Sequence, residues 1–208
     1  MSNIEQMRAV VCHGPQDYRV ENIAKPVAGP NELIVKIAAC GICAGDCKAY
    51  HGAPMFWKGV EPWVKAPVVP GHEFFGTVVE MGPGASEFHC VEMGDLVVAE
   101  QIVPCGKCKF CRSGKYWMCE VHNIFGFQQH VAEGGLSEYM RYPANAIVHK
   151  IPKTMSLQKR SSTAFLSKNL EKFSASMGKS LIGKKPLGRS SKPVIKNRLK
   201  QHSSWLLF

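Results

Sequence analysis

Fifteen residues near the middle of the chain, "CGKCKFCRSGKYWMC" (105–119), contain four cysteines in the spacing C-x2-C-x2-C-x7-C. Thiols spaced this closely and regularly favour a metal site over a disulfide framework. Cys105, Cys108, Cys111 and Cys119 supply the four thiolates of a closed tetrahedral zinc site, which leaves no open position for substrate or water. We therefore expect a structural zinc that shapes a loop. Reduced free cysteines or an iron–sulfur cluster remain the alternatives.

A second group of metal-type side chains is divided between two segments, "CGICAGDCKAYHG" (40–52) and "PGHEFFG" (70–76). Taken singly, each segment is a weak signal, because a lone cysteine is more often a small core residue and a His-Glu pair more often a solvated turn. The two segments together offer Cys40, Cys43, Asp46, Cys47, His51, His72 and Glu73.

The elements that must position these groups are predicted to be strands. Runs rich in β-branched and aromatic residues are punctuated by Gly and Pro, and no helical period longer than a few turns precedes residue 157. The pattern predicts a mainly β (α+β), barrel-like domain. The expected strands are 8–12, 17–23, 32–40, 73–82, 94–100 and two more within 137–152.

Charge divides the chain into two parts. Residues 1–157 hold 14 Lys/Arg against 15 Asp/Glu, a net of −1, whereas residues 158–208 hold 12 Lys/Arg against one acid, a net of +11. We expect residues 158–208 to form a basic, serine-rich, largely disordered tail without fixed contacts to the domain, apart from one helix at 163–177. The basic run supports only non-specific attraction to phosphates, so no specific nucleic-acid partner is expected.

Neither a signal-peptide pattern nor an apolar run of membrane-spanning length is visible in the sequence. The expectation is therefore a cytoplasmic protein without a membrane partner.

Four motifs follow one another along the chain: "GICAGD" (41–46), "PGHEFFGTVVEMG" (70–82), "GDLV" (94–97) and the four-cysteine stretch (105–119). In this order and separation they resemble the zinc-dependent medium-chain alcohol dehydrogenases, and within them the polyol (sorbitol-type) dehydrogenases. The resemblance extends from about Met7 to Leu157 and implies a GroES-like catalytic domain, with a zinc lobe, over residues 1–157.

The resemblance also implies roles for single residues. Cys43 and His72 match the cysteine and histidine ligands of the catalytic zinc, and Glu73 matches the neighbouring carboxylate that can itself bind the metal in the polyol branch. Asp46 matches an acid that orients the ligating histidine, in agreement with the usual carboxylate partner of a metal-bound imidazole. The four-cysteine cluster matches the structural zinc site.

One position departs from the family pattern. Gly45 stands where many members have a Ser or Thr that relays the proton of the alcohol. Water, Tyr50 or His51 would then have to take over that relay.

The implied activity is NAD- or NADP-linked oxidation of a sugar alcohol or secondary alcohol, with zinc as the Lewis acid. The implied partner is a small-molecule alcohol or polyol, and a homo-oligomer is possible by analogy. No G-x-G-x-x-G turn occurs in the sequence, and 51 residues after Leu157 are too few for a dinucleotide-binding domain. We therefore expect a domain truncated before the Rossmann domain, with its tail a frameshift product or an alternative end, and inactive alone. A non-catalytic zinc-binding interaction module is the alternative.

Overall fold

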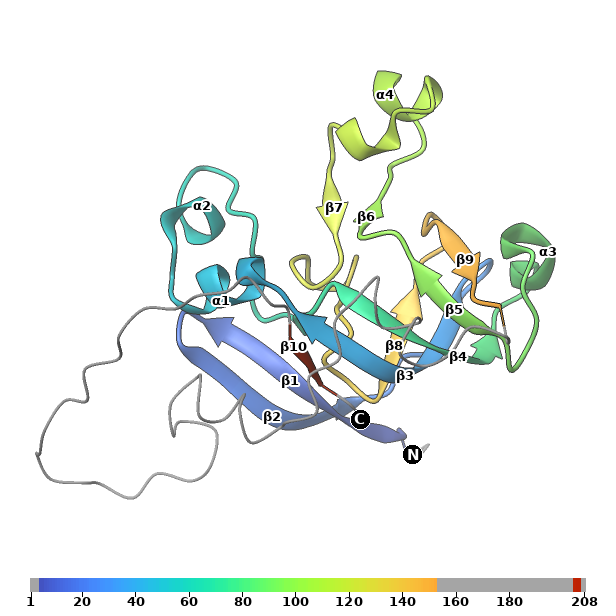
Figure 1. Cartoon of the computed structure of the whole chain (residues 1–208), viewed down its shortest axis with the longest axis horizontal. Coiled ribbons are helices and arrows are strands. Elements are labelled where there is room, and N and C mark those ends of the chain that lie inside the picture. Colours follow the sequence, from blue (N-terminus) through green and yellow to red (C-terminus); the bar gives the residue numbers. More distant parts are fainter. Residues whose placement is uncertain (1–3, 153–203, 207–208) are drawn as a thin grey trace, which may run out of the picture.

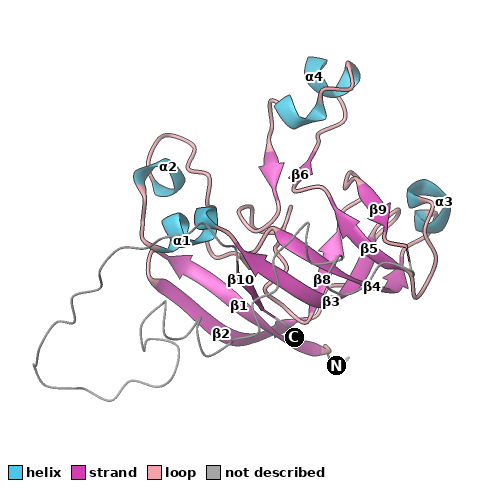
Figure 2. Ribbon diagram, viewed as in Figure 1, coloured by secondary structure: helices cyan, strands magenta, loops and turns pink. Residues whose placement is uncertain are grey.

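The computed structural model describes residues 4–152 and 204–206. Strands dominate, and the helices are short and peripheral (Figure 2). The strands are β1 (Gln6–Gly14), β2 (Asp17–Ala24), β3 (Leu33–Ile42), β4 (Glu73–Met81), β5 (Leu96–Ala99), β6 (Ile102–Val103), β7 (Asn123–Ile124), β8 (Tyr139–Tyr142), β9 (Val148–Lys150) and β10 (Ser204–Leu206). The helices are α1 (Ala44–Tyr50), α2 (Pro54–Trp57), α3 (Ala85–His89), α4 (Lys109–Arg112) and the 3-10 helix η1 (Tyr116–Met118).

The central strand of the main sheet is β3, whose sequence "LIVKIAACGI" is almost continuously apolar. It pairs antiparallel with β4 along one edge and with β8 along part of the other. Strands β5 and β9 extend the sheet beyond β4. A strand covered on both faces has no solvent side to mark with polar residues, which explains why this run lacks the usual alternation.

The hydrophobic core lies inside the curved sheet and is closed by the β1–β2 hairpin. Its largest fully buried side chains include Leu33, Ile34, Phe125, Met140 and Tyr142. The predicted strands are confirmed at all seven sites, and the GroES-like β-rich fold class is confirmed with them. The sequence did not predict β6 and β7, which are too short to carry a pattern.

The expectation that residues 158–208 make no fixed contacts with the domain is wrong for one short segment. Ser204–Leu206 form β10, which pairs antiparallel with Cys40–Ile42 of β3. Strand β8 covers that edge of β3 only at Leu33–Lys36, so the N–H and C=O groups nearer Ile42 remain able to accept a strand. The helix expected at 163–177 and the rest of the tail lie outside the described residues.

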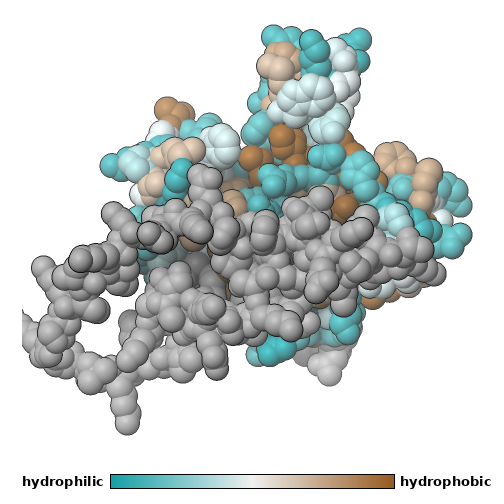
Figure 3. Space-filling view, viewed as in Figure 1, coloured by the Kyte–Doolittle hydropathy of each residue, from teal (hydrophilic) through white to brown (hydrophobic). Residues whose placement is uncertain are grey.

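A lobe projects from the sheet between β5 and β8 (Figure 1). Its base is closed by the antiparallel pairing of β6 with β7, and its tip carries α4 and η1. Apolar surface is visible where the lobe meets the barrel, whereas much of the lobe itself is polar (Figure 3). Among the described residues, no helix combines the length and apolarity that crossing a membrane requires.

Candidate metal centres

The lobe brings the four predicted cysteines together. The sulfurs of Cys105, Cys108, Cys111 and Cys119 all lie within 4.8 Å of one another. The Cys105 and Cys111 sulfurs are 4.0 Å apart, close to the edge of about 3.8 Å expected for a tetrahedron with Zn–S bonds of about 2.3 Å. All nine cysteines of the chain are free thiols, so no disulfide competes for this arrangement.

Backbone N–H groups of the lobe are directed at the sulfurs. Cys108 N donates to Cys105 Sγ at 3.4 Å, and Cys105 N donates to Cys119 Sγ at the same distance. The N–H groups of Cys111 and Glu120 lower the pKa of Cys108 to about 6. Donors that stabilise thiolates prepare the cluster for a cation, so the residues present fit a closed zinc site.

The second group is assembled by sheet register. In the β3–β4 pair, Gly41 lies opposite Glu73, so the residues just after β3 meet those just before β4. This brings Cys43, His72 and Glu73 together, with their ligand atoms all within 4.8 Å of one another. Cys43 Sγ lies 3.0 Å from His72 Nε2.

Helix α1 fixes the direction of the Cys43 side chain. Cys43 is the N-cap of α1, and its sulfur accepts the Gly45 N–H at 3.1 Å. Asp46, three residues on, accepts the Cys43 N–H at 2.9 Å through Oδ2 and completes a capping box. The local sequence therefore holds the thiol in place independently of any metal.

Gly71 sets the backbone that carries His72. Its φ of +96° lies in the left-handed region, and a Cβ there would come within 2.7 Å of Cys40 Sγ and 2.8 Å of Leu136 Cγ. A side chain at this position would clash with the buried Cys40 and Leu136 side chains and would strain the backbone, so the turn that carries His72 favours glycine.

Buried charge is concentrated at this triad. His72 is 8% exposed, and Asp46 Oδ1 lies 3.4 Å from its Nδ1. Burial alone lowers the pKa of His72, but Asp46 and Cys43 outweigh it and raise the pKa to about 10. Burial raises the pKa of Glu73, and the charge of Asp46 adds to this while His72 opposes it.

The surroundings of the Glu73 carboxylate indicate whether Cys43, His72 and Glu73 suit a metal ion. Its Oε2 is buried and has no hydrogen-bond partner within the described part of the chain. A buried carboxylate oxygen without a donor is costly unless a cation neutralises it. A thiolate, an imidazole and a carboxylate form a mixed set that suits zinc with an open coordination position, so these residues fit a catalytic type of site.

The remaining predicted candidates are not ligands of this group. Cys40 is fully buried in the core, and Cys47 is exposed on α1. Tyr50 is 7% exposed and packs edge-on against Tyr18, with ring centroids 5.2 Å apart. His51 caps the C-terminal end of α1 and is exposed.

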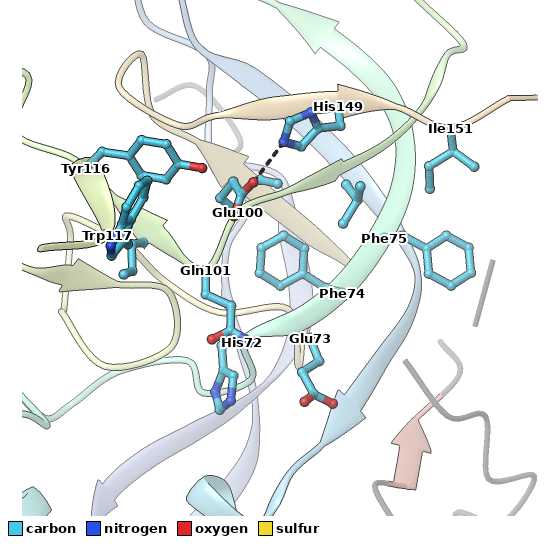
Figure 4. Close-up of a pocket in the computed structure, with 13 residues that line it drawn as sticks. His72, Glu73, Phe74, Phe75, Glu100, Gln101, Tyr116, Trp117, His149 and Ile151 are labelled. Carbon is cyan, nitrogen blue, oxygen red and sulfur yellow. Dashed lines mark hydrogen bonds and ion pairs between the residues drawn. The ribbon is translucent and has the colours of Figure 1, made fainter. Parts of the chain in front are cut away.

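A pocket of about 580 Å³ opens beside the triad. His72 and Glu73 line it together with Phe74 and Phe75, and the lobe contributes Tyr116 and Trp117 (Figure 4). Glu100, Gln101 and His149 complete its polar lining. Sequence reasoning did not assign any of these last five residues to a site. Glu100 and His149 meet only through strand pairing, and Tyr116 and Trp117 lie inside the four-cysteine stretch, where only the cysteines carried a signal.

Comparison with known proteins now identifies the family. The model of the alcohol dehydrogenase GroES-like domain matches residues 29–153. The chain belongs to this family. Both metal-type groups lie within the matched range, and the resemblance drawn from the four motifs is confirmed at the family level.

Individual relatives of this GroES-like domain are dehydrogenases. An erythritol/L-threitol dehydrogenase of Mycolicibacterium smegmatis is 48% identical over 149 residues, which cover 71% of this chain and 41% of the relative. The chain thus spans less than half the length of the curated relatives that it matches.

Two solved structures share the fold. A structure described as a zinc-binding dehydrogenase from Sinorhizobium meliloti, bound to NADP, aligns with a TM-score of 0.61 at 32% identity and covers 73% of this chain and 40% of that one. A cobalt- and zinc-bound alcohol dehydrogenase from Pyrobaculum aerophilum aligns with a TM-score of 0.57 at 32% identity, covering 71% and 43%.

Proposed function

We propose that residues 1–157 are the catalytic domain of a zinc-dependent dehydrogenase that oxidises a sugar alcohol or other secondary alcohol with NAD or NADP. The observation that carries the proposal is the convergence of Cys43, His72 and Glu73, with a partnerless buried oxygen on Glu73, at the edge of a pocket of about 580 Å³. The relatives named above support the reaction class. A cytoplasmic location is part of the same proposal.

The chain's own residues would divide the work as follows. Cys43, His72 and Glu73 hold the zinc, and Asp46 holds the His72 ring through Nδ1 so that Nε2 remains available to the metal. A zinc bound there supplies Lewis acidity toward an alcohol oxygen. The aromatic walls of the pocket, Phe74 and Trp117, exclude water from the side of the alcohol that faces them.

The four-cysteine cluster has a separate task in this proposal. It holds a structural zinc that fixes α4 and η1, and with them the lobe wall of the pocket. The partner is a small-molecule alcohol, and assembly into a homo-oligomer follows only by analogy.

Metal and alcohol binding test the proposal without turnover. Cobalt(II) loaded into the protein serves as an optical probe, and butan-2-ol is titrated against it. We expect a saturable change in the cobalt spectrum that is lost in Cys43→Ser and retained in Cys90→Ser, since Cys90 is exposed and remote from both groups. An alcohol response that survives in Cys43→Ser would overturn the assignment.

A turnover assay completes the test. With NAD or NADP added, we expect no cofactor reduction by these 208 residues alone, because a nicotinamide must be held within reacting distance of the alcohol and the sequence contains no G-x-G-x-x-G turn. Reduction that requires Cys43 would show a cofactor site within this chain.

A further inference from the structure

The pocket beside the triad has a second polar wall that the proposed metal chemistry does not use. Glu100 follows β5, and His149 lies on β9. His149 Nε2 lies 3.1 Å from Glu100 Oε1, and Tyr116 of η1 lines the same pocket. Figure 4 shows His149, Glu100 and Tyr116 at one end of the view and His72 and Glu73 at the other.

Strand register explains why this wall faces the triad. The β4–β5 pair sets Gly76 opposite Val97 and Thr77 opposite Leu96. Glu73 begins β4 and Glu100 follows β5, so this antiparallel pair directs both residues to one pocket. Their side chains lie at opposite ends of the view in Figure 4.

The groups of this wall are oriented yet open to a ligand. The hydrogen bond with His149 orients the Glu100 carboxylate, but the Glu100 side chain is 40% exposed and that of His149 is 56% exposed. Burial, followed by the charge of Glu100, raises the pKa of Tyr116, so its hydroxyl stays protonated and can donate. Glu100 Oε2 accepts, and the Tyr116 hydroxyl both donates and accepts.

The charge of the pocket restricts the class of ligand. Glu73 and Glu100 are its acidic side chains, and the described residues that line it include neither lysine nor arginine. An anionic substrate that reached Glu100 would bring a second carboxylate toward it with no lysine or arginine to balance the charge, which is unfavourable. A neutral ligand with several hydroxyls instead offers donors to carboxylate oxygens and acceptors to Tyr116.

We propose that Glu100, His149 and Tyr116 form a hydroxyl-binding subsite, which selects an uncharged polyol by holding its far hydroxyls while its reacting carbinol lies at Cys43, His72 and Glu73. The inference rests on the proposed function, because it takes the triad as the reacting end. Glu100 contacts the ligand directly, and His149 acts as a positioning residue through its hydrogen bond with Glu100.

The four-cysteine lobe would contribute to this specificity. Tyr116 and Trp117 are in η1, between Cys111 and Cys119 of the cluster. Their rings pack edge-on, with centroids 5.4 Å apart. A metal that fixes both flanking cysteines would therefore also fix the lobe wall of the subsite.

The test compares erythritol with butan-2-ol, using the cobalt-loaded protein and tryptophan fluorescence, with Trp117→Phe identifying the signal from the pocket. We expect erythritol to bind more tightly than butan-2-ol. In Glu100→Gln the erythritol Kd should rise about tenfold, because a hydrogen bond to a charged group is weakened, while the butan-2-ol Kd stays unchanged. His149→Leu should raise the erythritol Kd by a smaller factor.

Controls separate this inference from the proposed function. Glu87→Gln removes an exposed acid outside the pocket and should change neither Kd. 3-Hydroxybutyrate, whose carboxylate is its only charged group, should bind weakly and improve in Glu100→Gln. An erythritol Kd that is unchanged in Glu100→Gln, or no tighter than that of butan-2-ol in the unmodified chain, would overturn the subsite while leaving the triad assignment intact. Loss of every alcohol response in Cys43→Ser would still support the triad.

Discussion

Asp46 joins the two segments that build the triad. Its Oδ1 lies 3.4 Å from His72 Nδ1, and its Oδ2 accepts the Cys43 N–H at 2.9 Å. One carboxylate thus faces the ring of one proposed ligand at ion-pair distance and accepts the backbone N–H of another. The two contacts span 26 residues of sequence in one direction and three in the other. Each oxygen of the Asp46 carboxylate makes one of these two contacts. Asparagine keeps the shape of the side chain and removes its charge, so the two properties can be tested separately.

Asp46→Asn should weaken metal binding at the triad by about 10–100-fold. The amide oxygen can still accept the Cys43 N–H, but the neutral amide no longer favours the His72 tautomer that carries its proton on Nδ1 and leaves Nε2 for the metal. Metal binding at the four-cysteine cluster should not change. The measurement is competition with a chromophoric chelator, and Asp17→Asn in the exposed pair with Arg19 is the matched control. Equal triad affinity in the Asp46 and Asp17 variants would contradict the role given to Asp46.

Cys108→Ser should remove the more tightly held of two metal ions. A closed four-thiolate site binds zinc more strongly than a mixed site with an open position, so mild chelation of the unmodified chain should leave about one equivalent. The variant should retain much less after the same treatment, as measured by elemental analysis. Cys90→Ser, at an exposed cysteine outside both groups, should behave like the unmodified chain. Full retention in Cys108→Ser would show that the tight metal lies elsewhere.

Tyr142→Phe should leave the free energy of unfolding unchanged or raise it by about 1 kcal/mol. The Tyr142 hydroxyl is buried and has no hydrogen-bond partner among the described residues, so removing it removes a desolvated polar group while the ring contacts with Phe74 and Phe125 remain. Urea unfolding measures the change. Phe125→Ala, which removes a fully buried ring, should cost about 3–5 kcal/mol for comparison. A loss above about 1 kcal/mol in Tyr142→Phe would reveal a partner for the hydroxyl.

Glu138→Gln should change how stability depends on pH. The Arg8 N–H, followed by the Arg8 guanidinium, lowers the pKa of Glu138 below its ordinary value of 4.5. A carboxyl with a lowered pKa in the folded state contributes stability above its ordinary value, and that contribution is lost as the pH falls through the folded value. The difference in Tm between the two proteins should therefore be present at pH 7 and shrink below pH 4.5.

The size of that difference should be modest, because Arg8 is 66% exposed and water screens the pair. Glu61→Gln, which removes one partner of the exposed pair with Lys65, is the control and should show a smaller effect at pH 7. A difference between Glu138→Gln and the unmodified chain that grows toward acid pH would have the wrong sign for this explanation.

The sequence alone determined the features that depend on short spacing. Four cysteines within fifteen residues, in a spacing that suits one metal, predicted a cluster that the lobe does bring together, and the composition of the strands predicted a β-rich domain. The second group is different, because Cys43 and His72 are 29 residues apart and their separate segments carried little signal. From the sequence, only the resemblance of the four ordered motifs to a known family placed Cys43 and His72 in one site.

The tertiary structure decided everything that depends on strand register. The opposition of Gly41 and Glu73 assembles the triad, and the pairing of β5 with β9 brings Glu100 to His149 across 49 residues. Strand β10 reached β3 because an edge was left open there by β8, which no property of "SWL" itself could indicate. Register is set by the burial of one face against the whole core, and a shift of one residue would turn every side chain to the opposite face. Strand register therefore depends on the packing of the whole folded chain and cannot be read from a short local pattern of residues.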